Sequence, residues 1–124
     1  MSRNQSLGKW GENIAADYLI RKGYEILFRN WRSPYGELDL IANKGEVISF
    51  VEVKTRRGIA LGWPEESITP TKQEHLINTS QAFFDENEKY VDCQYQIDVI
   101  AILVESQEQR SFQIRHYENA VTGL

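Results

Sequence analysis

Cysteine and histidine are scarce in this sequence, and their scarcity excludes several kinds of site. Cys93 is the only cysteine among 124 residues, so the chain offers neither an internal disulfide nor a cysteine-rich zinc site. His75 and His116 stand alone, without a second histidine at metal-ligand spacing. No apolar run approaches the roughly 18 residues of a membrane span, and the first residues lead into no apolar signal-peptide core. We therefore expect a cytoplasmic protein with no membrane partner.

Length and charge narrow the class of protein further. A chain of 124 residues, 41% hydrophobic and 26% charged, is typical of one globular domain, which we expect to span residues 1–124. The net charge of −4 argues against a protein that coats nucleic acid. The charge is uneven, because residues 1–72 hold 11 Lys and Arg against 9 Asp and Glu, whereas residues 73–124 hold 3 against 9. The first part could face a polyanion, although solvated surface charge explains the same pattern.

Periodicity and turn residues predict helices and strands in the order α-β-β-β-α-β-β. We expect one helix between an N-cap at Ser6 and Gly23, and a second that begins at a capping box over Thr71–Glu74. Strands are expected at Tyr24–Arg32, Glu37–Ala42, Val47–Lys54, Tyr95–Val104 and Phe112–His116. Residues 55–70 are expected to form a loop. The nearly continuous apolar run of the fourth strand indicates burial on both faces, so the pattern predicts an α/β fold.

Alternation along two neighbouring strands brings two carboxylates and a lysine together. Glu52 and Lys54 are two residues apart on one predicted strand and therefore share a face. A hairpin turn over residues 43–46 places Asp39 opposite Phe50. Asp39 and Glu52 are then diagonal neighbours on one face, about 7–8 Å apart at the backbone.

These residue types suit the hydrolysis of phosphodiesters. Magnesium or manganese prefers oxygen ligands, and Asp39, Glu52 and the carbonyl of Val53 could supply them. A bound ion polarises a phosphate and lowers the pKa of a bound water, while Lys54 could orient that water or neutralise the developing charge.

Further residues are expected around this site. Glu12 falls almost on the apolar stripe of the first helix, where an acid is rarely placed without a partner, and it could hold a second ion or a water. Gln73 points along the buried face of the second helix at its amino end, so we expect both residues on the rim of the site. Trp63 could stack on a base or anchor its loop. The candidate contacts to nucleic-acid phosphates are Arg29, Arg32, Arg56, Arg57 and Lys72.

Three functions are compatible with these residues. The first is a metal-dependent nuclease, and the second is a module of the same fold that binds nucleic acid without cutting it. The third is an interaction protein whose charge cluster is structural, because ion-pair networks also place acids beside lysine. A pure binder gains nothing from three acids that face phosphate, which favours the nuclease.

The same residues belong to a series of motifs that resembles a known family. The motifs are GKWGE at residues 8–12, GY at 23–24, RNWR at 29–32, GELDLIA at 36–42 and FVEVKTR at 50–56. Gly62, Pro64, Lys72-Gln73, Asp98-Val99 and residues 114–120 extend the match over nearly the whole chain. Together they closely resemble the bacterial YraN-like family, which is similar to the PD-(D/E)XK nucleases and especially to archaeal Holliday-junction resolvases.

The resemblance implies a restriction endonuclease-like fold, with a mixed central sheet flanked by helices, and DNA as the substrate, including branched DNA. It maps the acid, acid and lysine of that superfamily onto Asp39, Glu52 and Lys54, with Glu12 as the acid of the first helix. Analogy with the resolvases implies a homodimer. The chain departs from the pattern at four positions, which are Leu38 in place of proline, Gln96 and Ile97 in place of arginine and phenylalanine, and Val121 in place of an aromatic residue.

Overall fold

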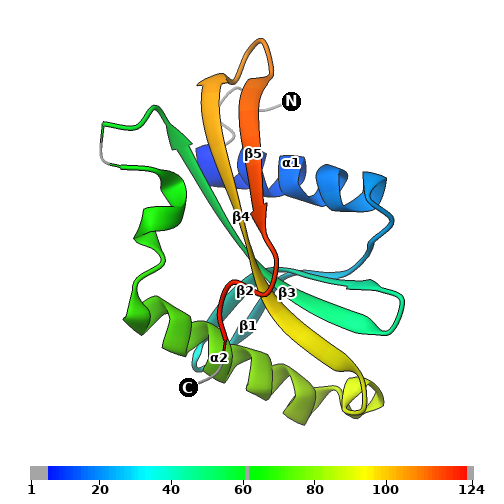
Figure 1. The fold of residues 1–124 in the computed structure, drawn as a ribbon. Coiled ribbons are helices and arrows are strands. Elements are labelled where there is room, and N and C mark those ends of the chain that lie inside the picture. Colours follow the sequence, from blue (N-terminus) through cyan, green and yellow to red (C-terminus); the bar gives the residue numbers. More distant parts are fainter. Residues whose placement is uncertain (1–5, 61, 123–124) are drawn as a thin grey trace.

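The computed structural model describes residues 6–60 and 62–122, and it confirms the predicted α/β order (Figure 1). Within these residues, the helices are α1 (Leu7–Arg21) and α2 (Pro70–Glu86), and the strands are β1 (Glu25–Ser33), β2 (Gly36–Lys44), β3 (Val47–Arg57), β4 (Gln94–Ser106) and β5 (Ser111–Tyr117). Two short 3-10 helices, η1 (Pro64–Ser67) and η2 (Glu88–Tyr90), flank α2. The prediction of a loop over residues 55–70 is therefore wrong in two places, because β3 continues to Arg57 and η1 forms within the segment. None of the described helices is long and apolar enough to cross a membrane.

Side-chain caps determine where both α-helices begin. Ser6 caps α1 as predicted, and its hydroxyl accepts a hydrogen bond from the backbone N–H of Lys9 at 3.1 Å. The capping box predicted at Thr71 is wrong, because α2 begins earlier. Thr69 caps this helix by accepting from the N–H of Lys72 at 3.2 Å, and Pro70 occupies the first turn. Proline suits this place because its fixed φ is helical and its missing N–H would have no partner in the helix.

The strands form one mixed sheet in the order β1-β2-β3-β4-β5. β3 and β4 are parallel, and the other three pairs are antiparallel. The parallel pair requires a crossover, which η1 and α2 supply. β4 has a strand on either side and is buried continuously from Ile97 to Ile102, which explains the apolar run in the middle of its sequence.

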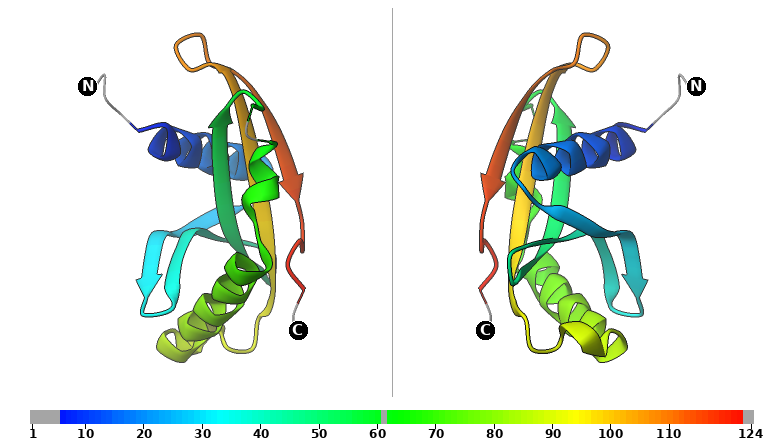
Figure 2. Two further views of the ribbon diagram at one scale, coloured as in Figure 1. Left: turned by 90° about the vertical axis from the view of Figure 1, so that its left-hand side faces the viewer. Right: turned by 90° about the vertical axis from the view of Figure 1, so that its right-hand side faces the viewer.

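Each helix covers a separate hydrophobic core. α1 packs over residues that include Leu40, Val51, Ile100 and Ile102. α2 packs over a second set, in which the ring of Phe83 contacts the rings of Phe28, Trp31 and Phe50 at centroid distances of 5.4–5.5 Å. Figure 2 shows that the β1–β2 hairpin leaves the plane of β3, β4 and β5 and runs between the two helices.

A kink in the β1–β2 hairpin was not visible in the sequence pattern. Alternation predicts that Leu38 and Leu40 share a face, but Leu40 packs in the α1 core whereas Leu38 packs in the α2 core. Opposite this point, Asn30 has a φ of 53°, a left-handed conformation that asparagine tolerates better than most residues. The kink lets the end of the hairpin turn towards α2.

A buried polar cluster joins α1 to β4 and β5. Asp98 is fully buried, and its Oδ2 lies 2.8 Å from Nε2 of His116, whose Nδ1 lies 3.1 Å from the hydroxyl of Tyr18. Oδ1 of Asp98 accepts from the side-chain amide of Gln96 at 3.0 Å and from the N–H of Asn119 at 2.9 Å. Gln96, which replaces the arginine usual in the resembling family, thus supplies a neutral donor to the same carboxylate.

The closest approach of α1 to the sheet gives a testable prediction. A Cβ at Gly11 would lie 1.8 Å from Oγ1 of Thr55 on β3, whereas a Cβ at Gly8 would meet nothing within 4 Å. We expect Gly11→Ala to lower the free energy of unfolding by about 1–3 kcal/mol, the usual effect of overpacking. Gly8→Ala, in the same helix, should raise it by up to about 1 kcal/mol because alanine favours helix. Urea unfolding of both variants tests this; equal stability of the two variants contradicts the close contact.

Candidate metal and phosphodiester site

The two predicted carboxylates meet where the pairing of β2 with β3 ends. The last pair along this ladder is Leu40 with Val51, and Asp39 and Glu52 are the next residues on the two strands. Oδ2 of Asp39 accepts a hydrogen bond from the backbone N–H of Val53 at 2.8 Å. Asp39 therefore reaches across to β3 and ties its carboxylate to the backbone beside Glu52.

The predicted register of this hairpin is wrong by two residues. Phe50 pairs with Ile41 rather than with Asp39, because Lys44 pairs with Val47 and leaves a two-residue turn, in which Gly45 has a φ of 62°. A shift of two residues keeps the paired side chains of the two strands on their predicted faces, since the side-chain period of a strand is two. The correction therefore brings the two carboxylates closer together than diagonal neighbours.

Glu52 is a buried carboxylate held by two lysines. Its side chain is 4% exposed, and its Oε2 lies 3.1 Å from Nζ of Lys72 and 3.8 Å from Nζ of Lys54. Lys54 comes from the same face of β3, and Lys72 comes from the first turn of α2. A buried charge needs such partners, because removal from water costs several kcal/mol. Lys72, predicted only as a phosphate contact, thus lies in the site itself.

The surroundings of Asp39 disfavour the ionised form of its carboxyl group. Burial, and then the negative charge of Glu52, raise the pKa of Asp39 to about 8, although the hydrogen bond from Val53 acts in the opposite direction. Among the residues that the structure describes, the ion pairs of Lys54 and Lys72 are both with Glu52, and Asp39 has no ion pair within 4.0 Å. A cation placed between the two carboxylates would favour the ionised form of Asp39 and relieve this repulsion.

Glu12 lies beside these residues in a second acidic group. Its side chain is 18% exposed and lies 4.0 Å from Nζ of Lys9. With its amide nitrogen turned towards the acids, the orientation that satisfies its neighbours, Asn30 donates to Glu12 and Glu37 at 3.2 Å each. Burial raises the pKa of Glu12, and the charges of Glu37 and Glu52 add to the effect against Lys9 and Asn30.

Sequence reasoning missed three residues that surround Glu12, namely Lys9, Asn30 and Glu37. The one signal in the sequence was Asn30. Asparagine has a low β-propensity and tolerates left-handed backbone conformations, so it is unexpected inside a strand rich in aromatic and branched residues. Glu37 also forms an ion pair with Arg32, with 3.0 Å between Oε2 and Nε.

The donor set matches magnesium or manganese better than zinc. Across residues 6–60 and 62–122, no three His, Cys, Asp or Glu side chains converge closely enough to hold a metal between them. Zinc sites in proteins take at least three such ligands, whereas magnesium binds through one or two carboxylates, with waters and substrate phosphates completing its shell. Asp39 and Glu52 fit that smaller requirement, and the Val53 main chain lies against Asp39.

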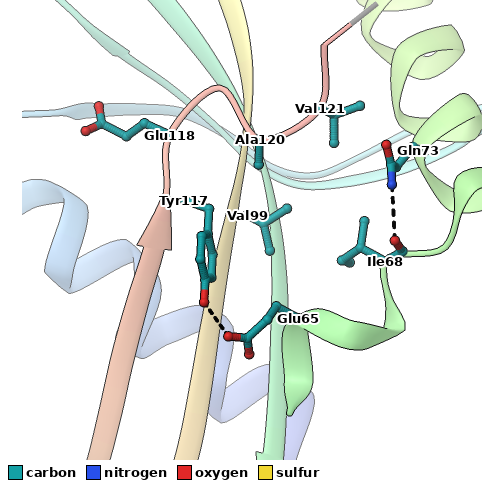
Figure 3. Close-up of a pocket in the computed structure, with 8 residues that line it drawn as sticks. All are labelled: Glu65, Ile68, Gln73, Val99, Tyr117, Glu118, Ala120 and Val121. Atoms are coloured by element: carbon teal, nitrogen blue, oxygen red, sulfur yellow. Dashed lines mark hydrogen bonds between the residues drawn. The ribbon is translucent and has the colours of Figure 1, made fainter. Parts of the chain in front are cut away.

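Gln73 and two of the predicted phosphate contacts, Arg29 and Arg57, form hydrogen bonds with residues outside the site. The side-chain amide of Gln73 donates to the carbonyl of Ile68 at 3.3 Å, and Gln73 lines a separate cavity (Figure 3). Arg29 donates to Asn13 at 2.9 Å, and Arg57 donates to Gln107 at 2.6 Å. Arg56 is partly exposed on β3. The roles predicted for these residues stay predictions.

Trp63 anchors its segment to the sheet. The guanidinium carbon of Arg115 on β5 lies 3.8 Å from the centroid of the Trp63 ring, a cation–π contact. One face of the indole is therefore occupied, which supports the anchoring interpretation over base stacking.

Comparison with known proteins assigns this chain to a family. A family model described as "Uncharacterised protein family UPF0102" matches residues 11–102. A UPF0102 protein of Syntrophomonas wolfei is 44% identical over 117 residues, which cover 94% of this chain and 98% of that protein. UPF0102 proteins of Caldicellulosiruptor saccharolyticus (46% identity, 79% of this chain and 82% of that protein) and Rhodococcus opacus (42% identity, 97% and 99%) are similar as well. The chain belongs to the UPF0102 family.

Proposed function

We propose that the protein is a magnesium- or manganese-dependent nuclease that hydrolyses phosphodiester bonds in DNA, including branched DNA. The observation that carries this proposal is the pairing of Asp39 and Glu52 at the end of the β2–β3 ladder, with Glu52 held between Lys54 and Lys72. The resemblance of the same residues to the PD-(D/E)XK nucleases supports it independently of the geometry.

The residues of the site divide the chemistry between them. A bound divalent ion supplies Lewis-acid chemistry by polarising the phosphate and activating a water. Asp39 and Glu52, with the Val53 carbonyl, would hold the ion, and Asp39 must lose its proton when the ion binds. Lys54 would orient the attacking water or donate to the phosphate oxygens. The water oxygen forms a bond to phosphorus as one P–O bond breaks, which leaves a phosphate monoester and a hydroxyl.

One feature of the site also suits a structural charge cluster. Lys72 lies 3.1 Å from Glu52 and already neutralises it, so this ion pair alone could account for the buried carboxylate. The two interpretations differ at Asp39, because no lysine contacts it directly and its pKa is raised. Experiments on Asp39 therefore discriminate between them.

The raised pKa of Asp39 predicts a pH dependence of stability without metal. The folded protein keeps this proton up to about pH 8, whereas the unfolded chain releases it near its ordinary pKa of about 4. Unfolding thus releases a proton between these values, and stability falls as pH rises through this window. Asp39→Asn removes the titration, so its melting temperature should rise relative to the parent protein from pH 5 to pH 9. Asp85→Asn, at an exposed position of α2, is the control; a similar trend in this control contradicts the assignment.

Metal binding should stabilise the parent protein only. At ten times the dissociation constant of manganese or magnesium, mass action contributes about 1.4 kcal/mol, which raises the melting temperature of a domain this size by several degrees. Asp39→Asn should abolish the shift while remaining folded. A structural cluster predicts no response to metal and a clear loss of stability in Asp39→Asn, so thermal melts of both proteins with and without manganese decide the question.

Cleavage should depend on the lysine as well as on the acids. We expect the parent protein, with magnesium or manganese, to nick or cut at least one member of a panel of linear, flapped and four-way DNA. Asp39→Asn should be inactive, and Lys54→Ala should lose about 100-fold or more, the usual effect of removing one transition-state donor. Lys89→Ala, at an exposed position on η2, should keep full activity.

The same panel distinguishes the alternatives. Undiminished cleavage by folded Lys54→Ala removes the lysine from the mechanism, and activity that persists in Asp39→Asn indicates a contaminating nuclease. Salt-dependent binding without cleavage indicates a binding module, and no binding at all indicates a structural cluster.

A further inference from the structure

The end of the β1–β2 hairpin stands apart from the rest of the sheet. β2 pairs with β3 only over residues 40–44, whereas it pairs with β1 as far as the turn, where Ser33 is opposite Gly36. Beyond Asp39, β2 therefore has β1 as its only strand neighbour within the described part of the chain. Figure 2 shows this end of the hairpin leaving the plane of β3, β4 and β5. It thus starts at the carboxylate site and projects from it.

Helix α2 supports the projecting hairpin from one side. Trp31 and Leu38, which are opposite each other on the two strands, both belong to the α2 core, and the Trp31 ring lies 5.5 Å from the ring of Phe83. At the turn itself, a Cβ on Gly36 would lie 3.1 Å from Oγ1 of Thr79 on α2. The hairpin is therefore packed in one position before any ligand arrives, which lowers the entropic cost of binding.

The turn presents a large aromatic side chain to solvent. Oγ of Ser33 accepts a hydrogen bond from the N–H of Tyr35 at 3.0 Å and donates to the carbonyl of Gly36 at 3.4 Å, and Pro34 has a φ fixed by its ring. Serine, proline and glycine are the residues that such a turn requires, whereas tyrosine is not. Tyr35 is nevertheless 59% exposed at this place. The turn therefore holds an aromatic ring in the open on a fixed backbone.

Two arginines add positive charge to the same hairpin. Arg29 is exposed on β1, and the side chain of Arg32 is 79% exposed next to the turn. The ion pair of Arg32 with Glu37 lies at the surface, where such pairs contribute little, so a phosphate could replace Glu37 as its partner. Exposed aromatic rings and positive charge are the two features by which proteins hold unpaired strands of nucleic acid.

The length of the hairpin relates the aromatic ring to the carboxylates. Tyr35 precedes Asp39 by four residues of β2, which span at most about 13 Å at 3.3 Å per residue. One strand of DNA rises about 3.4 Å per nucleotide, so the ring reaches a base up to about four nucleotides from a phosphate at the carboxylates. Within a continuous duplex both faces of each base are covered by its neighbours. A base offers a free face only where paired strands separate or end.

We propose that Tyr35 stacks on the exposed base at a branch point of the substrate DNA, where paired strands separate. The inference rests on the proposed function, because it places the backbone of that strand at Asp39 and Glu52. Since the turn is fixed in position, it also sets the distance from the branch point to the phosphate that is cut. Branched DNA is then bound more tightly than a continuous duplex, and the hairpin is the part of the protein that distinguishes them.

Binding of two matched DNA molecules tests this inference without cleavage. A linear duplex and a forked duplex of the same strand lengths, mismatched over one end, carry the same number of phosphates. Fluorescence anisotropy with the metal-free or calcium-loaded protein should show tighter binding of the forked duplex by about fivefold or more, the low end for stacking on one base. Tyr35→Ala should reduce this ratio to about one and leave binding of the linear duplex unchanged. Tyr35→Phe keeps the ring and should keep the preference.

A spectroscopic signal and a control variant complete the test. The fluorescent base 2-aminopurine, placed at the fork, should be quenched when the parent protein binds, because stacking quenches it, and this quenching should be lost in Tyr35→Ala. Val91→Ala changes an equally exposed apolar residue far along the chain from the hairpin and should behave as the parent protein. Equal binding of both duplexes by the parent protein, or a preference and quenching that survive in Tyr35→Ala, overturns the inference and leaves the proposed nuclease intact. No binding of either duplex at any salt concentration overturns both.

Discussion

The buried negative charge of Glu52 is the constraint around which the other parts of the site are arranged. β3 places this carboxylate under the first turn of α2, almost out of contact with water. Three segments meet there: β2 brings Asp39, β3 brings Lys54, and α2 brings Lys72. The cap at Thr69 sets where α2 begins and therefore where Lys72 projects. The surrounding fold thus holds two carboxyl groups close together, and burial together with the charge of Glu52 raises the pKa of Asp39 to about 8.

The central part of the site was predictable from the sequence for a simple physical reason. Side chains on a strand alternate between its two faces with a period of two. If the predicted register of the hairpin is wrong by an even number of residues, Asp39, Glu52 and Lys54 therefore still lie on the predicted face. The prediction misjudged the register by two residues and still placed both carboxylates on one face. Helix caps were less certain, because Thr69 and Thr71 are both suitable capping residues and only Pro70 separates them.

Contacts between distant segments were not predictable from periodicity. The kink at Asn30 moves Leu38 from one core to the other, and it arises from a left-handed backbone conformation that alternation does not encode. The contact of Lys72 with Glu52 depends on how the whole crossover packs, as does the cavity that Gln73 lines. Gln73 was expected on the rim of the site, and nothing in the sequence predicts that its side-chain amide donates to the carbonyl of Ile68.

The parallel pairing of β3 with β4 has a consequence for the growing chain. β1, β2 and β3 leave the ribosome as a contiguous antiparallel unit, but the second neighbour of β3 is synthesised only after residues 58–93. Until then β3 presents an open hydrogen-bonding edge, and both hydrophobic cores lack the residues that β4 supplies. The nascent protein therefore passes through a stage at which β3, the strand that carries Glu52 and Lys54, exposes an edge that can pair with a wrong strand.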